Sequence, residues 1–349
     1  MIKFNQVYMR IIVLSVALLI GCSIKLNAQI KDKTTIRGFI DMGSSYDIDN
    51  EKLNFQFGEQ DLFITSDLTD KISFLGESVF KYSPTSPTKF DISLERAIFK
   101  YNYKGNHNFF AGKVHTALNY WNDSYHHGRL FFPTVGRPEL FNQNIIPLHT
   151  TGFGLSGHDL GNLKFGYTFM VGNGLGSTDL SDNNVEKCYI FAAHFKPLDG
   201  LRIGGSYYTD KIDGVVHNHG GGVTRAHNVR QNLYSGSIAY FKKKIEFLAE
   251  ATSCQNLTDS IGVKTTYAAY AYLGFRIKDI LIPYVRYDNV DYEKGEMYFT
   301  SVNTEMFSAG LRYEMNYLTS VKLEYQYKKS GTTNPIFSNN IFLQIAVGF

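Results

Sequence analysis

Sixteen short segments of alternating apolar and polar residues follow one another along this chain, and they constrain its fold more than any other feature. The segments are residues 34–46, 53–68, 71–82, 90–103, 108–117, 149–158, 162–173, 185–197, 200–211, 227–242, 244–256, 264–277, 280–292, 301–316, 319–329 and 339–349. Alternation with a period of two indicates a β-strand with two different faces. Every second connection is short, as at residues 69–70 and 278–279, and the others are longer and rich in Gly, Asn, Asp and Ser.

This rhythm predicts an all-β fold, a transmembrane antiparallel up-and-down β-barrel of about 16 strands with short periplasmic turns and long outer loops. Past residue 28 there is no apolar run long enough for a spanning helix. The 24 Tyr and 27 Phe suit the aromatic girdles of such a barrel. A soluble β-sandwich of equal length has no reason to alternate its loop lengths so regularly.

The start of the chain indicates export to the outer membrane of a Gram-negative bacterium. Residues 1–28 resemble a cleaved signal peptide, in which Lys3 and Arg10 flank an apolar core and Ala28 offers the cleavage point. The barrel domain would then be residues 29–349. The basic residues of the signal segment account for the whole formal net charge of +3, so the mature chain gives no reason to expect a nucleic-acid partner.

The three cysteines leave one alternative open. Residues 19–22 resemble a lipoprotein signal, and cleavage there would leave a lipidated Cys22. Cys188 and Cys254 lie in strand-like segments and are interpreted as small apolar residues rather than as a disulfide. No Cys or His cluster has the spacing of a metal site, and no cofactor is expected.

The end of the chain supports the barrel independently. Residues 339–349 alternate strictly and finish on Phe349, which lies on the more apolar face of the segment. This ending resembles the terminal strand of outer-membrane barrels. We therefore interpret Phe349 as the signal that the barrel assembly machinery reads.

Charges at alternating positions predict which face of each strand points into the lumen, because a charge on the lipid face near midplane costs about 2–4 kcal/mol for Arg or Lys. The residues predicted to face the lumen include Arg37, Asp41, Arg286, Asp288, Arg312 and Glu324. Glu95 and Arg96 are adjacent, so they cannot both point inward in a regular strand. A β-bulge, or a position near a loop, would resolve this conflict.

The third outer connection, residues 118–148, is too apolar for a solvated loop. We expect it to fold into the barrel and to narrow the pore, with Glu77, Glu246, Glu250 and Glu324 as wall carboxylates for its arginines. The predicted constriction residues are His115, His126, His127, Arg129, Arg137 and Glu139. Arg129 and Arg137 could equally pin the loop through ion pairs. His126 and His127 could bind a metal, but structural hydrogen bonds are the favoured interpretation.

Three blocks of sequence resemble a known family. They are residues 112–141 (GKVHTALNYWNDSYHHGRLFFPTVGRPELF), residues 61–80 (DLFITSDLTDKISFLGESVF) and residues 93–101 (SLERAIFKY). These blocks resemble a family of Bacteroidetes outer-membrane porin-like proteins and, more loosely, the phosphate-selective porins O and P. The resemblance implies a fold and a compartment more than a substrate.

These observations predict a porin, a passive diffusion channel for small hydrophilic solutes or ions, and not an enzyme. The first alternative is a structural or partner-binding barrel whose lumen is blocked by residues 118–148. An outer-membrane lipid hydrolase is the least favoured alternative, because no nucleophile elbow is present. The expected partners are outer-membrane lipid, the assembly machinery and small solutes, and a homotrimer is left open.

Overall fold

The computed structural model describes residues 33–125, 128–175, 181–182, 184–213, 215–218, 221–224, 228–242, 244–259, 261–299 and 302–349. The predicted signal peptide, Cys22, His126 and His127 lie outside the described residues. Among those described, no helix is long and apolar enough to cross a membrane.

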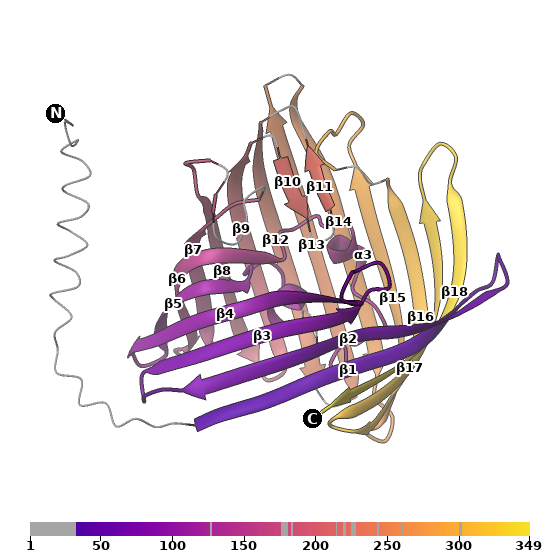
Figure 1. Cartoon of the computed structure of the whole chain (residues 1–349), viewed down its shortest axis with the longest axis horizontal. Coiled ribbons are helices and arrows are strands. Elements are labelled where there is room, and N and C mark those ends of the chain that lie inside the picture. Colours follow the sequence, from indigo (N-terminus) through magenta and orange to yellow (C-terminus); the bar gives the residue numbers. More distant parts are fainter. Residues whose placement is uncertain are drawn as a thin grey trace.

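The described chain forms a closed antiparallel β-barrel of 16 strands, which confirms the predicted fold (Figure 1). The strands are β1 (Lys33–Asp47), β2 (Lys52–Asp67), β3 (Ile72–Tyr82), β4 (Phe90–Lys104), β5 (His107–His115), β6 (His149–Leu160), β7 (Phe165–Gly172), β8 (Cys188–Leu198), β9 (Leu201–Ile212), β12 (Val229–Lys242), β13 (Ile245–Thr258), β14 (Gly262–Phe275), β15 (Leu281–Tyr292), β16 (Thr304–Asn316), β17 (Thr319–Ser330) and β18 (Ile336–Gly348). Each strand pairs with its neighbours in the sequence, and β1 pairs with β18 to close the ring. A separate hairpin, β10 (Val215–Asn218) and β11 (Gly221–Thr224), lies in the connection between β9 and β12.

Each predicted segment corresponds to one strand of the barrel. Both described chain ends lie at the same end of the barrel, here called the terminus end, because Phe39 pairs with Gly348. The other end is the loop end. The alternation of loop lengths is less regular than predicted, since the loop-end connections at residues 48–51 and 259–261 are as short as turns. The strands there continue further than their side-chain pattern suggests.

The two faces of the strands follow the predicted register. In β17, Lys322 and Glu324 are fully buried in the lumen, whereas the alternating residues Leu323 and Tyr325 are exposed on the outer surface. β16 shows the same alternation. The cost of placing a charge against lipid therefore predicts side-chain direction correctly in these strands.

A β-bulge resolves the conflict at Glu95 and Arg96. Glu77 of β3 pairs with Arg96, and the next residue, Ser78, pairs with Leu94, so Glu95 is the extra residue. Glu95 is buried, and the guanidinium of Arg96 contacts the carboxylate of Glu77. Of the two explanations that the sequence left open, the structure therefore shows the bulge, which turns both charges away from lipid.

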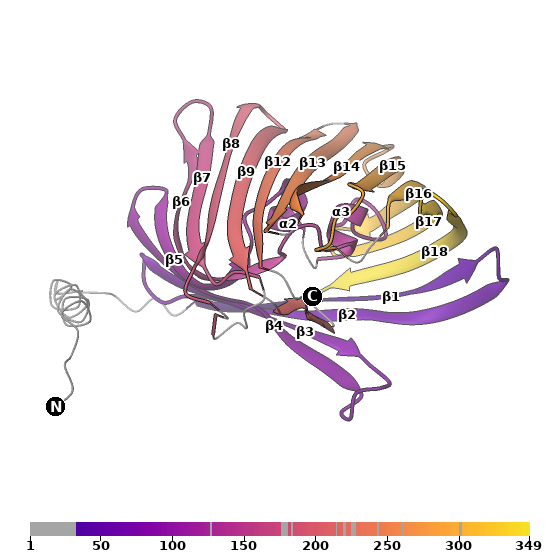
Figure 2. The same ribbon diagram turned by 90° about the horizontal axis from the view of Figure 1, so that it is seen from above.

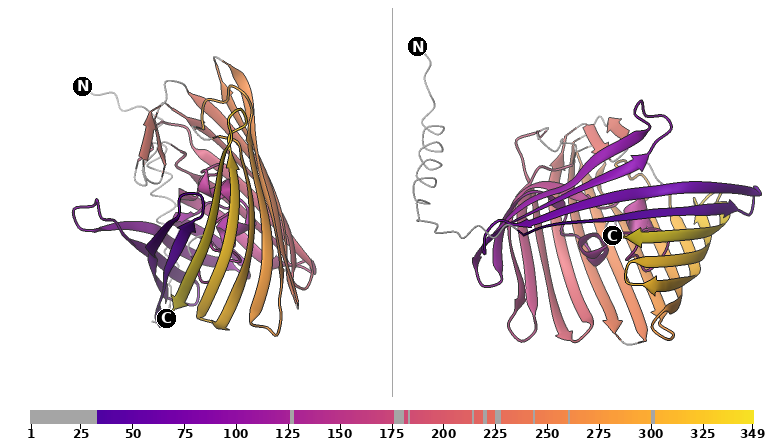
Figure 3. Two further views of the ribbon diagram at one scale, coloured as in Figure 1. Left: turned by 90° about the vertical axis from the view of Figure 1, so that its right-hand side faces the viewer. Right: turned by 60° about the horizontal axis from the view of Figure 1, so that its bottom comes forward.

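The shortness of β5 creates the entrance for the long loop. β4 pairs with β5 only from Ala97 onward, because β5 ends at His115 while β4 begins at Phe90. The first residues of β4 therefore extend past the end of β5. After His115 the chain leaves the barrel wall at this point. Figure 3 shows the strongly inclined β1 to β4 on one side of the barrel and the steeper β12 to β17 on the other.

The seam between β1 and β18 ends at the last residue of the chain. The amide of Phe349 donates to the carbonyl of Gly38 at 2.9 Å, and the amide of Gly38 donates to the carbonyl of Phe349 at 3.1 Å. A Cβ on Gly38 would lie 2.3 Å from Cζ of Phe349 and 2.9 Å from the carbonyl oxygen of Asp61, so the ring in its present position packs directly on this glycine. Phe349 thereby completes the ladder that closes the barrel.

We predict that Phe349→Asp reduces the amount of assembled barrel without changing the conductance of the barrels that form. This substitution would remove the terminal aromatic ring and place a second carboxylate beside Gly38. The measurement is the amount of heat-modifiable protein in the outer-membrane fraction. Tyr317→Asp is the control, because Tyr317 is also an exposed aromatic residue at the terminus end. Equal amounts of Phe349→Asp and parent protein would contradict the prediction.

Candidate functional site

The connection between β5 and β6, residues 116–148, folds into the interior of the barrel, and we call it the inner loop. It contains two short helices, α2 (Tyr120–Ser124) and α3 (Glu139–Asn142). Seen along the barrel in Figure 2, both helices lie inside the ring of strands. Hydrogen bonds from the inner loop to β13, β15, β16 and β17 confirm the predicted inward fold.

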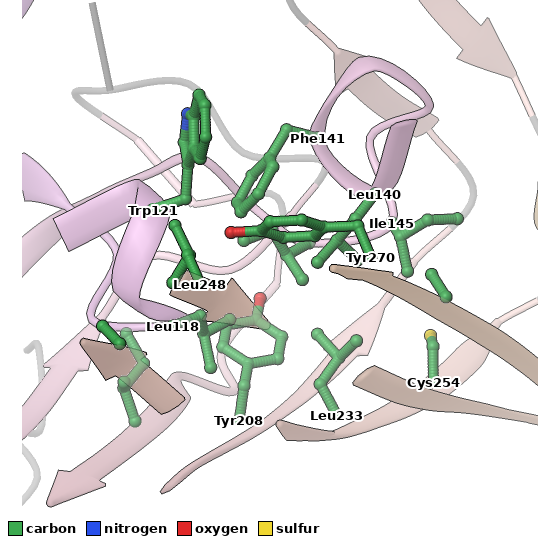
Figure 4. Packing of buried hydrophobic residues seen from close by; sticks show 14 of the residues in the cluster. Leu118, Trp121, Leu140, Phe141, Ile145, Tyr208, Leu233, Leu248, Cys254 and Tyr270 are labelled. Carbon is green, nitrogen blue, oxygen red and sulfur yellow. The ribbon is translucent and has the colours of Figure 1, made fainter. Parts of the chain in front are cut away.

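Apolar side chains of the inner loop pack against one side of the barrel wall. Those that are at most 2% exposed are Leu118, Trp121, Phe132, Leu140, Phe141, Ile145 and Ile146. Inward residues of the wall, including Tyr208, Leu233, Leu248 and Tyr270, complete the cluster (Figure 4). The Trp121 ring contacts those of Phe132 and Tyr270 at centroid distances of 5.1 and 6.0 Å. The sequence predicts that the apolar side chains of this loop must be buried. The wall of β7 to β15 provides the surface that buries them.

Carboxylates of the wall accept hydrogen bonds from backbone amides of the inner loop. Glu250 of β13 accepts from the amides of Tyr120 and Trp121 at the start of α2. Asp288 of β15 accepts from the amide of Glu139 at 2.9 Å, at the start of α3. A loop without regular structure must satisfy its buried amides through such partners.

Glu324 of β17 extends this pattern to the segment between the helices. It accepts from the amide of Val135 at 3.1 Å and from the hydroxyl of Tyr284 at 2.7 Å. Tyr270 likewise donates to Glu250 at 2.5 Å. The inward tyrosines of β14 and β15 thus orient the carboxylates that hold the loop. Sequence reasoning missed these tyrosines, although the alternation of β14 places them on the lumen side.

Cations of the wall donate to carbonyl groups of the same segment. Arg286, which is 1% exposed, donates to the carbonyls of Gly136 and Arg137 at 2.8 and 3.3 Å. Arg312 donates to the carbonyl of Pro133 at 3.1 Å, and Lys322 donates to that of Arg129 at 2.5 Å.

Each buried arginine also has an acidic partner on the wall. Arg286 pairs with Asp288 at 2.7 Å, and Arg312 pairs with Glu246 at 2.8 Å. Removing one member of such a pair typically costs about 3–5 kcal/mol, because the other charge is left buried without compensation. Residues 129–139 are thus held between donors and acceptors of β15 to β17.

The acids that pair with Arg129 differ from those predicted. Arg129 lies 3.5 Å from Asp41 and 3.7 Å from Glu59, on β1 and β2. The four wall carboxylates expected to serve the loop arginines have other partners. Glu77 pairs with Arg96, and the other three hold wall cations or loop amides. For Arg129 the prediction was wrong, because spacing along the chain does not show which wall a loop arginine approaches.

Arg137 and Glu139 both lie at the loop-end side of the inner loop. Burial lowers the pKa of Arg137, while the carboxylates of Glu59 and Glu95 act in the opposite direction. Burial also disfavours ionisation of Glu139. The Lys328 ammonium, 2.8 Å away, and hydrogen bonds from Gln143 and Asn142 together outweigh it, so the pKa of Glu139 is lowered. Glu139 is therefore an ionised, paired carboxylate near neutral pH.

His115 lies at the end of β5, beside a second histidine that the sequence analysis did not single out. Its ring centroid is 5.4 Å from that of His149, and its Nε2 atom lies 3.7 Å from Glu77. Nε2 of His149 lies 2.9 Å from Glu95. The strand pairing of His115 with His149 at the mouth of the inner loop is the signal that would have revealed this pair. In the described parts of the chain, no group of three or more His, Cys, Asp or Glu residues could hold a metal ion.

The structure places the other predicted lumen residues as follows. Asp41, Arg286, Asp288, Arg312 and Glu324 are buried inside the barrel. Arg37 is exposed near the start of β1, at the terminus end, on the same strand face as Asp41. The site thus consists of the inner loop and the charged wall of β13 to β18 and β1.

Among the described residues, the inner loop adjoins cavities in three places. The one at the loop end, about 290 Å³, is lined by Arg129, Arg137, Glu139 and residues of β1, β2 and β16 to β18. At the terminus end, one of about 290 Å³ lies against β13 to β17. Another, of about 230 Å³, lies between α2 and the strands β6 to β9 and β12. Residues of the inner loop line each of these cavities.

Comparison with known proteins identifies the fold. No family model matches this sequence, and no curated protein matches it. An anion-selective porin from Comamonas acidovorans has a TM-score of 0.66 at 10% identity, over 91% of this chain and 100% of that one. The outer membrane channel DcaP of Acinetobacter baumannii has a TM-score of 0.65 at 11% identity, over 92% of this chain and 99% of that one. The trimer form of OmpT, an outer membrane protein of Vibrio cholerae, has a TM-score of 0.63 at 12% identity, over 91% of this chain and 99% of that one.

The chain has the fold of outer-membrane porins. The likeness covers nearly the whole of each compared chain, while identities of 10–12% mean that it concerns the fold alone.

We predict that Glu250→Ala loosens α2 within the lumen. The substitution leaves two buried amides without acceptors, at about 1–3 kcal/mol each. Trp121 is the single tryptophan of the chain and follows Tyr120 in α2, so its emission should shift to longer wavelength. Glu305→Gln, in an exposed ion pair with Lys329, is the control and should leave the emission unchanged. Unchanged emission in Glu250→Ala would show that this carboxylate does not hold the loop.

Proposed function

We propose that the protein is an outer-membrane porin, a passive diffusion channel for small hydrophilic solutes or ions. The observation that carries this proposal is the inner loop, which divides a wide barrel into cavities lined by charged and polar side chains. A barrel of this strand number leaves an aqueous lumen unless something fills it. A polar constriction within it favours hydrated solutes over lipid.

We further propose how the chain reaches and occupies its membrane. Residues 1–28 would be a cleaved signal peptide, residues 29–349 the barrel, and Phe349 the signal for the assembly machinery. The terminus end would face the periplasm and the loop end the outside. One protein of similar fold is described in a trimer form, which supports a homotrimer as one assembly of this chain.

The proposed constriction is formed by His115, His126, His127, Arg129, Arg137 and Glu139. Arg129 and Arg137 line the loop-end cavity together with Asp41, Glu59 and Glu139. Charges in such a confined space are weakly screened, so they act on every ion that passes. The positive and negative side chains there are equal in number, because Lys81 also lines the cavity. We therefore expect weak ion selectivity in the parent protein.

A second candidate is a non-conducting barrel that binds a partner or serves the structure of the membrane. The apolar cluster around Trp121 favours this second function, because it fills the lumen beside β7 to β15 with packed side chains. Conductance in planar bilayers distinguishes the two functions. A protein that assembles and does not conduct would support the blocked barrel.

We predict that shortening the inner loop raises single-channel conductance, because residues 118–148 occupy part of the cross-section. The measurement is the conductance of purified protein in planar bilayers. Shortening the connection at residues 83–89 between β3 and β4 is the control, since that connection lies outside the lumen. If the inner-loop variant conducts no better than the parent, the loop is not the constriction.

We also predict that the double variant Arg129→Gln/Arg137→Gln shifts selectivity toward cations. It removes two positive charges from the loop-end cavity and leaves Asp41 and Glu59. The measurement is the reversal potential in a KCl gradient. Lys52→Gln/Lys89→Gln is the control, because both lysines are exposed outside this cavity and carry the same total charge. A reversal potential equal to that of the parent would show that these arginines do not line the path of the ions.

A further inference from the structure

The cavity beside α2 differs in chemistry from the other two, and we call it the α2 cavity. It lies between the helix and the lumen face of β6 to β9 and β12, toward the terminus end. Its inward wall residues are mostly small or hydroxylic: Ser156, Thr168, Ala192, Gly204, Ser206, Ser235 and Ser237. The opposite wall of the barrel carries Arg, Lys, Glu and Tyr at the corresponding depth. Space is therefore left open on one side of the lumen.

Several hydroxyl groups of the α2 cavity are available to a ligand. Ser235 bonds to Thr252 at 2.8 Å, and Ser206 accepts from the amide of Asn119 at 3.4 Å. The side chains of Ser156, Thr168 and Ser237 make no hydrogen bond to another described residue. A hydroxyl both donates and accepts, so these groups suit a ligand that does the same.

One guanidinium lies at the edge of the α2 cavity. Arg202 of β9 donates to Asp123 of α2 at 2.9 Å, and its charged group lies 5.0 Å from the centre of the Tyr120 ring. It also contacts Nδ1 of His194 at 3.2 Å. Its Nε is buried and has no hydrogen-bond partner among the described residues. A donor that is buried without a partner favours a ligand that supplies an acceptor.

The α2 cavity carries no net permanent charge. Arg202 and Asp123 are the only Lys, Arg, Asp or Glu residues among the described residues that line it. An anion would compete with Asp123 for Arg202, and a cation would compete with Arg202 for Asp123. A neutral molecule with several hydroxyls displaces neither charge and can bond to both, because adjacent donors and acceptors match adjacent hydroxyls.

We propose that the α2 cavity binds a neutral, polyhydroxylated solute of monosaccharide size. Its volume of about 230 Å³ lies below the range of about 300–1,000 Å³ that drug-sized ligands occupy. The proposal rests on the proposed channel function, because the solute would reach the cavity through the lumen. It names the class of solute that the channel retains during passage.

Binding can be measured without conductance, because Trp121 follows the cavity residue Tyr120 in α2. The experiment titrates the refolded or membrane-extracted full-length protein with glucose, glucuronate and glucosamine while Trp121 emission is recorded. We expect a saturable change with glucose, and about tenfold weaker responses to the acid and the amine, because each disturbs the Arg202–Asp123 pair.

Variants test which groups bind the sugar. Arg202→Gln and Asp123→Asn should each weaken the glucose response about tenfold, the effect of one charge-assisted hydrogen bond. Thr168→Val keeps nearly the same volume and removes only a hydroxyl, so a weakening of about threefold is expected. Lys264→Gln, which breaks an ion pair with Glu293 in a loop-end turn, is the matched control and should bind as the parent does. Heat-modifiable mobility verifies that each variant is assembled.

The outcomes separate this proposal from the channel function. Conductance without a saturable glucose response overturns the proposal and leaves the channel intact. A glucose response without conductance supports the binding site and contradicts the channel, and with it the retention of the sugar during passage. Equal responses to all three sugars, or an unchanged response in both Arg202→Gln and Thr168→Val, would also overturn it.

Discussion

The structure depends on hydrogen bonds between fixed charges of the barrel wall and the backbone of the inner loop. Glu250, Asp288 and Glu324 accept from loop amides, while Arg286, Arg312 and Lys322 donate to loop carbonyls. A loop inside a barrel has no strand ladder to satisfy its polar groups, so the wall must supply the partners. Without them, each buried amide or carbonyl would cost about 1–3 kcal/mol, and the loop would be more stable in water.

This anchoring explains why the lumen has two kinds of surface. The apolar side chains of the loop pack against β7 to β15, and its backbone meets the charged wall of β13 to β17. What remains open are the cavities at either end of the loop, where charges occur in pairs. The proposed solute passage, ion selectivity and sugar binding all depend on where this one segment of the chain is held.

Much of the fold follows from the sequence, because the side-chain period of a strand and the cost of charge against lipid are local effects. They predict the 16 strands of the barrel and the inward direction of the charges in β15 to β17. They also indicate that the backbone must be irregular at Glu95, where the structure has a bulge. They do not predict the hairpin of β10 and β11. The site is less predictable, because it depends on which wall the inner loop approaches. The pairing of Arg129 with Asp41 and Glu59 and the role of Tyr270 join residues far apart in the chain. No spacing rule connects them.

Hydrogen–deuterium exchange of the assembled barrel tests the anchoring of the inner loop most directly. The amides of Trp121, Val135 and Glu139 lie outside the strand ladder and donate to wall carboxylates. They should exchange as slowly as strand amides, and much more slowly than those of Thr85 and Thr88 in the connection between β3 and β4. Exchange of all three as fast as that of Thr85 and Thr88 would contradict the account.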